Sequence, residues 1–266
     1  MEKTMAEQRA IRHAVVTMDK GIATLTISDA GSLNILSTPV IKDVTAQLKI
    51  LRIDSSIRAL VLRGTGDKGL IGGADIKEMA ALNRQTGEEF ISNLREMCDG
   101  LRHFPTPVIA RMPGWTLGGG LEVAMACDLR IASQSAKFGM PEVKVGIPSV
   151  IHASLIPRLI GGARAAWLLL TGETVDSATA LGWGLVLEVV PDDELDKAVS
   201  RVASSLAGMG PEVLRQQKRL LREWEDQDLD ASIVASVLEF GAAFETGEPQ
   251  RYMQEFLDKK AARHSS

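Results

Sequence analysis

The sequence predicts an α/β fold with a helical region at its C-terminal end. Up to about residue 200, short β-branched and apolar segments alternate with amphipathic segments, which is the pattern of strands and crossover helices. Beyond that point strand signals nearly vanish and consecutive helical patterns follow. We therefore expect residues 1–200 to form a core that carries the active site. Residues 201–266 are expected to form a helical region used for packing and oligomerisation.

The first half of the chain supplies most of the strands. β-branched residues flank the turn Asp19-Lys20-Gly21, which predicts a hairpin of residues 15–17 and 22–26. Ser37-Thr38-Pro39 combines a hydroxyl cap with an early proline, and apolar residues at helical spacing follow as far as Leu51. Further strands are expected at 58–63, 107–110 and 129–132, with helices at 87–103 and 121–126.

The second half is mainly helical. A strand is expected around Phe138 and a last one at 186–190. Apolar residues at helical spacing then predict helices at 193–206, 211–224, 230–244 and from Pro249 to about Lys260.

Composition excludes several classes of protein. The 30 Lys and Arg residues against 34 Asp and Glu give a net charge of −4, which argues against nucleic acid or an anionic membrane as the main partner. Cys98 and Cys127 have no CxxC spacing and no histidine cluster nearby, so neither a disulfide framework nor a metal site is expected. Prolines and charges interrupt the apolar stretch 147–170, and residues 1–12 lack the apolar core of a secretory signal. A cytoplasmic location is expected.

Two glycine clusters are candidates for anion binding. Gly72-Gly73-Ala74-Asp75 follows a predicted strand, and Gly118-Gly119-Gly120 opens a predicted helix. Glycine turns let a backbone N–H point into a cleft, and a helix N-terminus adds the positive end of its dipole. Two such groups aimed at one oxygen form an oxyanion hole. The alternative is two ordinary turns, because glycine is the commonest turn residue.

Glu122 and Glu142 are candidates for acid–base chemistry. Glu122 lies in the first turn of an apolar helix, and Glu142 follows a turn after the strand near Phe138. Two carboxyl groups in unequal surroundings can divide the roles of acid and base. The alternative is a helix-dipole contact for Glu122 and a solvated loop position for Glu142.

Three blocks of sequence resemble the enoyl-CoA hydratase/isomerase (crotonase) family. They are KGLIGGADIKEM at residues 68–79, GGGLEVAMACD at 118–128 and FGMPEVKVG at 138–146. The blocks keep the order and spacing of the family, and the resemblance covers essentially the whole chain. It implies a crotonase-like spiral of ββα units with a helical C-terminal region.

The resemblance also implies roles for particular residues. Backbone N–H groups of Ala74 and Gly119 would polarise a thioester carbonyl, and Glu122 and Glu142 would occupy the two acid–base positions of the hydratases. By family precedent, Glu142 handles the proton at Cα while Glu122 orients and activates water. Coenzyme A, which enters as part of the substrate so that no separate cofactor is expected, would be bound by Lys68, Gly72, Asp75, Ile76 and Lys77.

The chain departs from the family pattern in two places. The segment SDAGSLN at residues 28–34 lacks the usual lysine, which removes one expected CoA contact. Where the family usually reads G-x-x-P-G-x-G-G-x-x-R-L, this chain carries IPSVIHASLIPRL at 147–159. Pro148, Ser149, Val150 and His152 are therefore expected to line the acyl pocket. His152 is alternatively a helix-face histidine with a structural hydrogen bond.

The resulting prediction is an enoyl-CoA hydratase that adds water to a trans-2-enoyl-CoA and gives a 3-hydroxyacyl-CoA. It would act in fatty acid metabolism as a homotrimer or a dimer of trimers. Alternatives are a family member with the same oxyanion hole that acts as an isomerase, a lyase or a decarboxylase. A non-catalytic CoA-binding or RNA-binding relative is a further alternative, disfavoured by the two glutamates and the net charge of −4.

Overall fold

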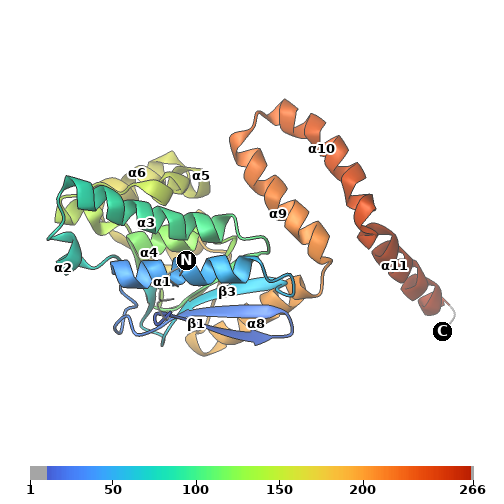
Figure 1. The fold of residues 1–266 in the computed structure, drawn as a ribbon, viewed down its shortest axis with the longest axis horizontal. Coiled ribbons are helices and arrows are strands. Elements are labelled where there is room, and N and C mark those ends of the chain that lie inside the picture. Colours follow the sequence, from blue (N-terminus) through green and yellow to red (C-terminus); the bar gives the residue numbers. More distant parts are fainter. Residues whose placement is uncertain (1–10, 265–266) are drawn as a thin grey trace, which may run out of the picture.

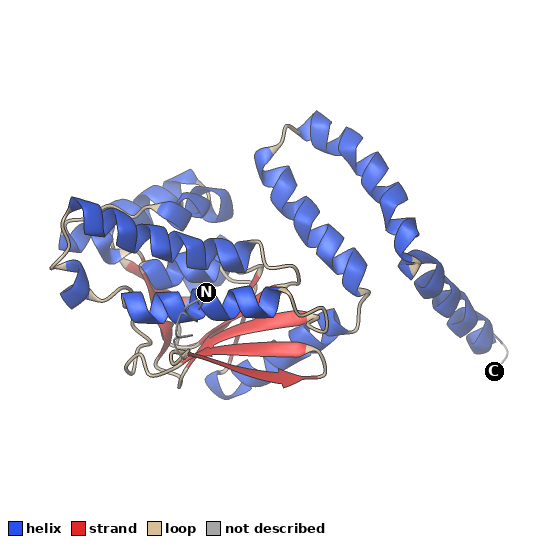
Figure 2. Cartoon of the chain, in the orientation of Figure 1, coloured by secondary structure: helices blue, strands red, loops and turns tan. Residues whose placement is uncertain are grey.

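Two mixed sheets with helices packed on them form the body of the protein (Figures 1 and 2). A computed structural model describes residues 11–264. Most of the segment used to exclude a secretory signal, residues 1–10, lies outside the described residues. No helix within the described range is long and apolar enough to cross a membrane.

The larger sheet has six strands and contains the predicted N-terminal hairpin. Its spatial order is β1 (Ala14–Asp19), β2 (Ile22–Ile27), β3 (Ala59–Gly64), β5 (Val108–Met112), β7 (Leu129–Ser133) and β10 (Glu188–Val190). Only the β1–β2 pair is antiparallel, and each of the other neighbouring pairs is parallel.

The smaller sheet has four strands of three residues each. Its spatial order is β4 (Gly69–Ile71), β6 (Trp115–Leu117), β8 (Lys137–Gly139) and β9 (Thr174–Asp176). β4, β6 and β8 run parallel to one another, and β9 runs antiparallel to β8.

The chain passes between the sheets in a repeating way. In the pairs β3–β4, β5–β6 and β7–β8, the first strand joins the larger sheet and the second joins the smaller one. Helical segments follow each pair: α2 (Ile76–Met79) with α3 (Arg84–Arg102), then α4 (Gly119–Ala126), then the 3₁₀ helix η1 (Pro141–Val145). This repetition confirms the predicted α/β fold as a spiral of ββα units.

Both faces of the larger sheet are covered. Leu60 and Leu62 of β3 belong to the main core, together with residues of α1 (Thr38–Arg52), α3 and α4. Val61, between them, points to the opposite face and belongs to a smaller core with residues of α8 (Leu195–Ala207). Successive side chains of a strand alternate in this way, so the wholly apolar β3 segment is explained by burial on both sides.

Short helices lead from the smaller sheet to α8. They are η2 (Ile151–Leu155), α5 (Ile156–Ile160), α6 (Gly162–Thr171), α7 (Ser177–Trp183) and η3 (Asp192–Glu194). The boundary expected at residue 200 falls inside α8, whose apolar residues pack on the larger sheet. The helices that leave the body begin only at Pro211.

We call α9 (Pro211–Asp226), α10 (Leu229–Ala243) and α11 (Glu248–His264) the C-terminal arm; η4 (Phe244–Thr246) lies between the last two. The arm extends away from the body (Figure 1). Of the residues of α9, all within the described range, Lys218 is the only one that is buried. Its Nζ lies 2.7 Å from Asp128 Oδ2 and donates to the carbonyls of Leu101 and Thr106 at 3.3 and 3.0 Å. Arg222 Nη2 lies 2.5 Å from the other oxygen of Asp128.

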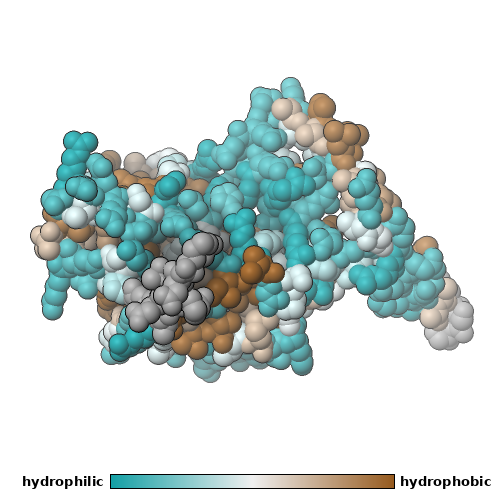
Figure 3. Space-filling model, viewed as in Figure 1, coloured by the Kyte–Doolittle hydropathy of each residue, from teal (hydrophilic) through white to brown (hydrophobic). Residues whose placement is uncertain are grey.

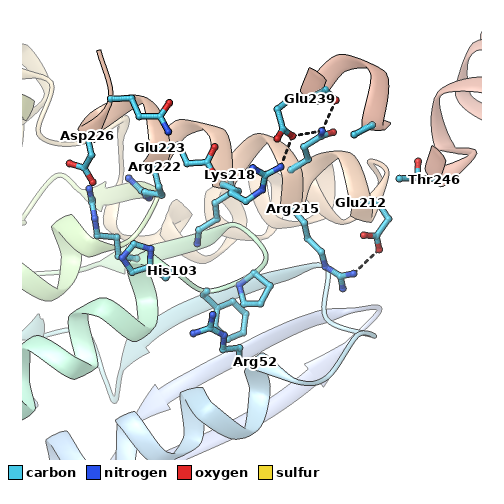
Figure 4. Close-up of a pocket in the computed structure, with 17 residues that line it drawn as sticks. Arg52, His103, Glu212, Arg215, Lys218, Arg222, Glu223, Asp226, Glu239 and Thr246 are labelled. Carbon is cyan, nitrogen blue, oxygen red and sulfur yellow. Dashed lines mark hydrogen bonds and ion pairs between the residues drawn. The ribbon is translucent and has the colours of Figure 1, made fainter. Parts of the chain in front are cut away.

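A charged cavity of about 830 Å³ separates α9 from the body (Figure 4). Lys218, Arg222, His103 and Arg52 are among its lining residues. Arg219 and Gln216 of α9 donate hydrogen bonds to the carboxylate of Glu239 in α10, which fixes these two helices to each other. Polar contacts, rather than an apolar core, therefore hold the arm in place.

Candidate active site

Three neighbouring parallel strands of the smaller sheet end at the same edge, and each leads into a predicted site segment. β4 leads to Gly72-Gly73-Ala74, β6 to the helix that carries Glu122, and β8 to Glu142. The carboxyl ends of parallel strands are the usual position of ligand sites in α/β proteins. A cavity of about 990 Å³ lies at this edge, and Ala74, Gly119, Glu122 and Glu142 all line it.

The N–H of Ala74 is free of backbone partners in the described chain. Ala74 and Leu36 form an isolated parallel bridge, in which Leu36 N–H donates to the Gly73 carbonyl and Asp75 N–H donates to the Leu36 carbonyl, both at 2.9 Å. This pattern uses the groups on either side of Ala74 and leaves its own N–H to the cavity that it lines.

Within the described residues, the N–H of Gly119 has no backbone partner because of its place in α4. Gly119 is the first residue of the helix, where no intrahelical acceptor exists. The positive end of the helix dipole adds to its affinity for an anion. Both expected oxyanion donors therefore lie on one cavity, on segments that follow neighbouring strands.

Gly118 makes room for the Glu142 carboxylate. Its backbone has φ +52° and ψ −126°, which L side chains rarely adopt. A Cβ added there would lie 2.9 Å from Glu142 Oε1. The glycine is required both by the turn between β6 and α4 and by the close approach of this acid.

Glu122 is a buried carboxyl group on a buried helix. It is 3% exposed, and all of α4 is buried around it. Burial raises the pKa of Glu122 to about 8, the charge of Glu142 acts in the same direction, and a hydrogen bond from Ala153 N–H at 3.0 Å opposes the rise. The group is therefore mainly protonated at neutral pH.

Glu142 occupies a more open position in η1. It is half-buried, and burial raises its pKa as well. Its own backbone N–H and, less strongly, a hydrogen bond from Ser149 Oγ to Oε2 at 3.0 Å lower the pKa. The two acids thus share one cavity but differ in solvent access and in the donors that they accept.

Four of the five expected CoA residues line the cavity: Gly72, Asp75, Ile76 and Lys77. Asp75 caps α2, because its carboxylate accepts the N–H groups of Lys77 and Glu78 at 2.8 and 3.2 Å. Glu78 in turn accepts from the N–H and hydroxyl of Thr38, which anchors α2 to α1. Lys68 is exposed and does not line this cavity, because it precedes β4 and so lies at the opposite end of that strand.

The expected acyl-pocket residues divide in the same way. Pro148, Ser149 and Val150 line the cavity, but His152 does not. The fold turns at Ile151, and His152 points toward α3, where its Nε2 lies 3.4 Å from Asp99 Oδ1. It lines a separate polar pocket of about 320 Å³. His152 was expected to line the acyl pocket, and this expectation is wrong. Its placement matches the alternative of a histidine on a helix face with a structural contact.

The site also has an apolar wall and two hydrogen bonds that the sequence does not predict. Phe90, Ile91 and Leu94 of α3 line the cavity. Their spacing indicated a helix but not which of its apolar residues would face the core or the cavity. The bonds from Ser149 to Glu142 and from Ala153 to Glu122 join residues 7 and 31 positions apart. No local pattern in the sequence marks either contact.

Comparison with known proteins identifies the family and agrees with this fold. Residues 17–266 match the enoyl-CoA hydratase/isomerase family, and the chain belongs to that family. It is 31% identical to a short-chain-enoyl-CoA hydratase from Clostridium acetobutylicum over 94% of this chain and 96% of the relative. It is 32% identical to a crotonyl-CoA hydratase from Syntrophomonas wolfei over 95% and 98% of the two chains. These relatives support an enzyme of the enoyl-CoA hydratase kind.

Solved structures give the same result. An enoyl-CoA hydratase from Bacillus anthracis superposes with a TM-score of 0.90 at 28% identity, covering 93% of this chain and 97% of the other. DspI from Pseudomonas aeruginosa also gives 0.90 at 28% identity, covering 97% and 98%. The helical C-terminal region is part of the shared fold.

Proposed function

We propose that this chain adds water across the 2,3 double bond of a trans-2-enoyl-CoA thioester and gives a 3-hydroxyacyl-CoA. The observation that carries the proposal is the convergence on one cavity of two unpaired backbone N–H groups and two glutamates. The similarity to named hydratases over more than nine-tenths of the chain supports the same activity.

The proposed chemistry follows from the electronics of the substrate. A double bond conjugated to a thioester becomes electrophilic at Cβ when negative charge can move to the carbonyl oxygen. The N–H groups of Ala74 and Gly119 would stabilise that charge, and one such donor typically contributes about 3–4 kcal/mol. No cofactor beyond the CoA of the substrate is needed.

The two glutamates would then manage one water molecule. Glu122, protonated at neutral pH, orients the water through hydrogen bonds. Glu142, as a carboxylate, takes a proton from this water while the oxygen bonds to Cβ, and then delivers the proton to Cα. The water is thereby divided between the two carbons, and both glutamates return to their starting state.

CoA would enter along Gly72, Ile76 and Lys77. Lys77 is exposed at the cavity edge, where a flexible ammonium group suits a phosphate. The acyl chain would lie between Phe90 and Leu94 of α3 and the apolar residues near Val150.

The test is a panel of trans-2-enoyl-CoA thioesters, with hydration followed by an 18-Da mass increase and by loss of the conjugated absorbance. We expect Glu122→Gln and Glu142→Gln each to lower kcat by about 10²- to 10⁴-fold with folding intact. Glu173→Gln, an exposed acid near the same loop, is the matched control.

The alternative activities give different products. Isomerisation without a mass change would show that the same oxyanion hole serves double-bond migration instead. CoA thioester binding without turnover, unaffected by either glutamine variant, would contradict the enzymatic proposal.

We also propose that the chain forms a homotrimer, or a dimer of trimers, in the cytoplasm and that it acts in fatty acid metabolism. The support for assembly is the apolar surface of the C-terminal arm, visible along α10 in Figure 3. Its most exposed members, between 59% and 79% exposed, are Leu229, Ile233, Val234, Val237, Leu238, Phe240 and Phe256. Apolar area of this kind marks an interface.

Light scattering after gel filtration tests the assembly. Val237→Glu combined with Leu238→Glu should convert the trimer to a monomer, because two charges would have to be desolvated in each contact. Ile53→Glu, an exposed apolar residue of the body at 86% exposure, should leave the mass unchanged. A monomeric wild-type protein at micromolar concentration would contradict the proposal.

A further inference from the structure

One short segment of the chain contacts both candidate glutamates. Ser149 Oγ donates to Glu142 Oε2 and Ala153 N–H donates to Glu122 Oε1, both at 3.0 Å. The segment 149–153 therefore provides one donor to each acid. Residues between the two donors determine how the donors are placed relative to each other.

The segment is constrained from within and from outside. Ile151 has φ +39°, which is a strained conformation for a β-branched residue. Directly after it, the buried His152 ring lies against Asp99 of α3. A segment fixed in this way can hold the Ser149 hydroxyl in one direction.

The two donors differ in their dependence on sequence. Ala153 donates from its backbone, so any residue except proline supplies the same bond. Ser149 donates from its side chain, at the position after Pro148 where the family pattern usually has glycine. Glycine has no hydroxyl, so a chain with the usual family pattern could not make this hydrogen bond to Glu142.

We infer that Ser149 is a positioning residue for the proposed hydration, and that its hydroxyl holds Glu142 in the orientation that exchanges a proton with water. The inference rests on the proposed function. Oε2 is bound by Ser149, while Oε1 lies where the missing side chain of Gly118 leaves room for it. The carboxylate is thus fixed at one oxygen and kept clear of obstruction at the other.

The electrostatic surroundings make the effect of Ser149 measurable. The ionisable residues that line the cavity are Glu122, Lys77, Lys144, Asp75, Asp29 and His13. Glu122, on α4, is mainly protonated at neutral pH and so offers Glu142 no charge, and Lys144 is paired with Glu173 at 2.7 Å. No cation of the described residues pairs with Glu142, so hydrogen-bond donors stabilise its ionised form: its own backbone N–H first, and then the Ser149 hydroxyl.

The experiment compares Ser149→Ala, Ser149→Gly and Ser149→Thr with Ser154→Ala. Ser154 directly follows this segment and lines the separate polar pocket, so its variant controls for disturbance of the neighbouring backbone. We expect the alanine and glycine variants to lower kcat about 10-fold with little change in KM. The acid limb of the pH profile should move up by about one unit, because the carboxylate has lost a donor. The threonine variant keeps the hydroxyl and should restore most of both properties.

A second readout separates this inference from the proposed function. Carbon-13 NMR of side-chain-labelled glutamate, assigned with Glu142→Gln, measures the pKa of Glu142 without substrate. A higher pKa in Ser149→Ala supports the positioning role even if no enoyl-CoA is hydrated, in which case the proposed function alone fails. Hydration by the wild type, with kcat, the pH profile and the pKa of Glu142 all unchanged in Ser149→Ala, would overturn the inference.

Discussion

Replacing Gly118 with alanine tests whether the Glu142 carboxylate needs the space that a side chain at this position would fill. The backbone there, at φ +52° and ψ −126°, costs an L-residue about 1–3 kcal/mol. The new Cβ would lie 2.9 Å from Glu142 Oε1, so the carboxylate has to move. Displacing a reacting group by about 1 Å can lower the rate about 100-fold.

Gly66→Ala provides the matched control. Gly66 has φ +73°, and a Cβ there would meet no atom within 4 Å. Both variants should lose stability in urea unfolding, since both place alanine at a positive φ. Only Gly118→Ala should lose about 100-fold in kcat for hydration of crotonyl-CoA at a temperature where both are folded. If the two variants differ in kcat by less than twofold, the proposed reservation of this space is refuted.

Three further predictions concern other contacts. The folded protein holds the Glu122 proton with a pKa of about 8, so the free energy of unfolding of the wild type should fall by up to roughly 5 kcal/mol as the pH rises from about 4.5 to 8. Urea titrations at several pH values measure this slope, and Glu122→Gln should flatten it. Lys218→Met leaves Asp128 with one cation fewer and should lower the stability by roughly 3–5 kcal/mol, which faster proteolysis after residue 210 would report. The control Lys197→Met, at an exposed position, should be cleaved at the wild-type rate. Asp75→Ala removes the cap of α2 and should cost about 1 kcal/mol, with a raised KM for the CoA thioester as the kinetic readout.

The sequence predicted the long elements and the places where site residues follow strands. Turn residues mark the ends of strands, so the positions of the glycine clusters and of both glutamates could be predicted from local sequence. In the structure these segments lie on one cavity. The smaller sheet was less accessible to sequence reasoning. The strand around Phe138 was predicted and is β8, but β4 and β6 have three residues each, too few for a period of two to be recognised.

Contacts between distant residues account for the remaining differences. The position of His152 depends on the left-handed conformation of Ile151, which a β-branched residue gives no reason to expect. Lys218 looks like a surface residue in an amphipathic helix, yet it is buried against Asp128, 90 positions earlier in the chain. Such pairings follow from tertiary packing and leave no local signal.

The complete burial of α4 limits how this enzyme can acquire new substrates. Every residue of the helix is enclosed, and a Cβ on Gly120 would lie only 2.4 Å from the Ile71 carbonyl oxygen. Random mutagenesis should therefore recover few viable changes in α4. The solvent-facing residues Ile147, Pro148 and Val150 tolerate replacement far better. Laboratory evolution toward bulkier thioesters is best directed at those three positions, which leaves Ser149 and the anion-binding frame untouched.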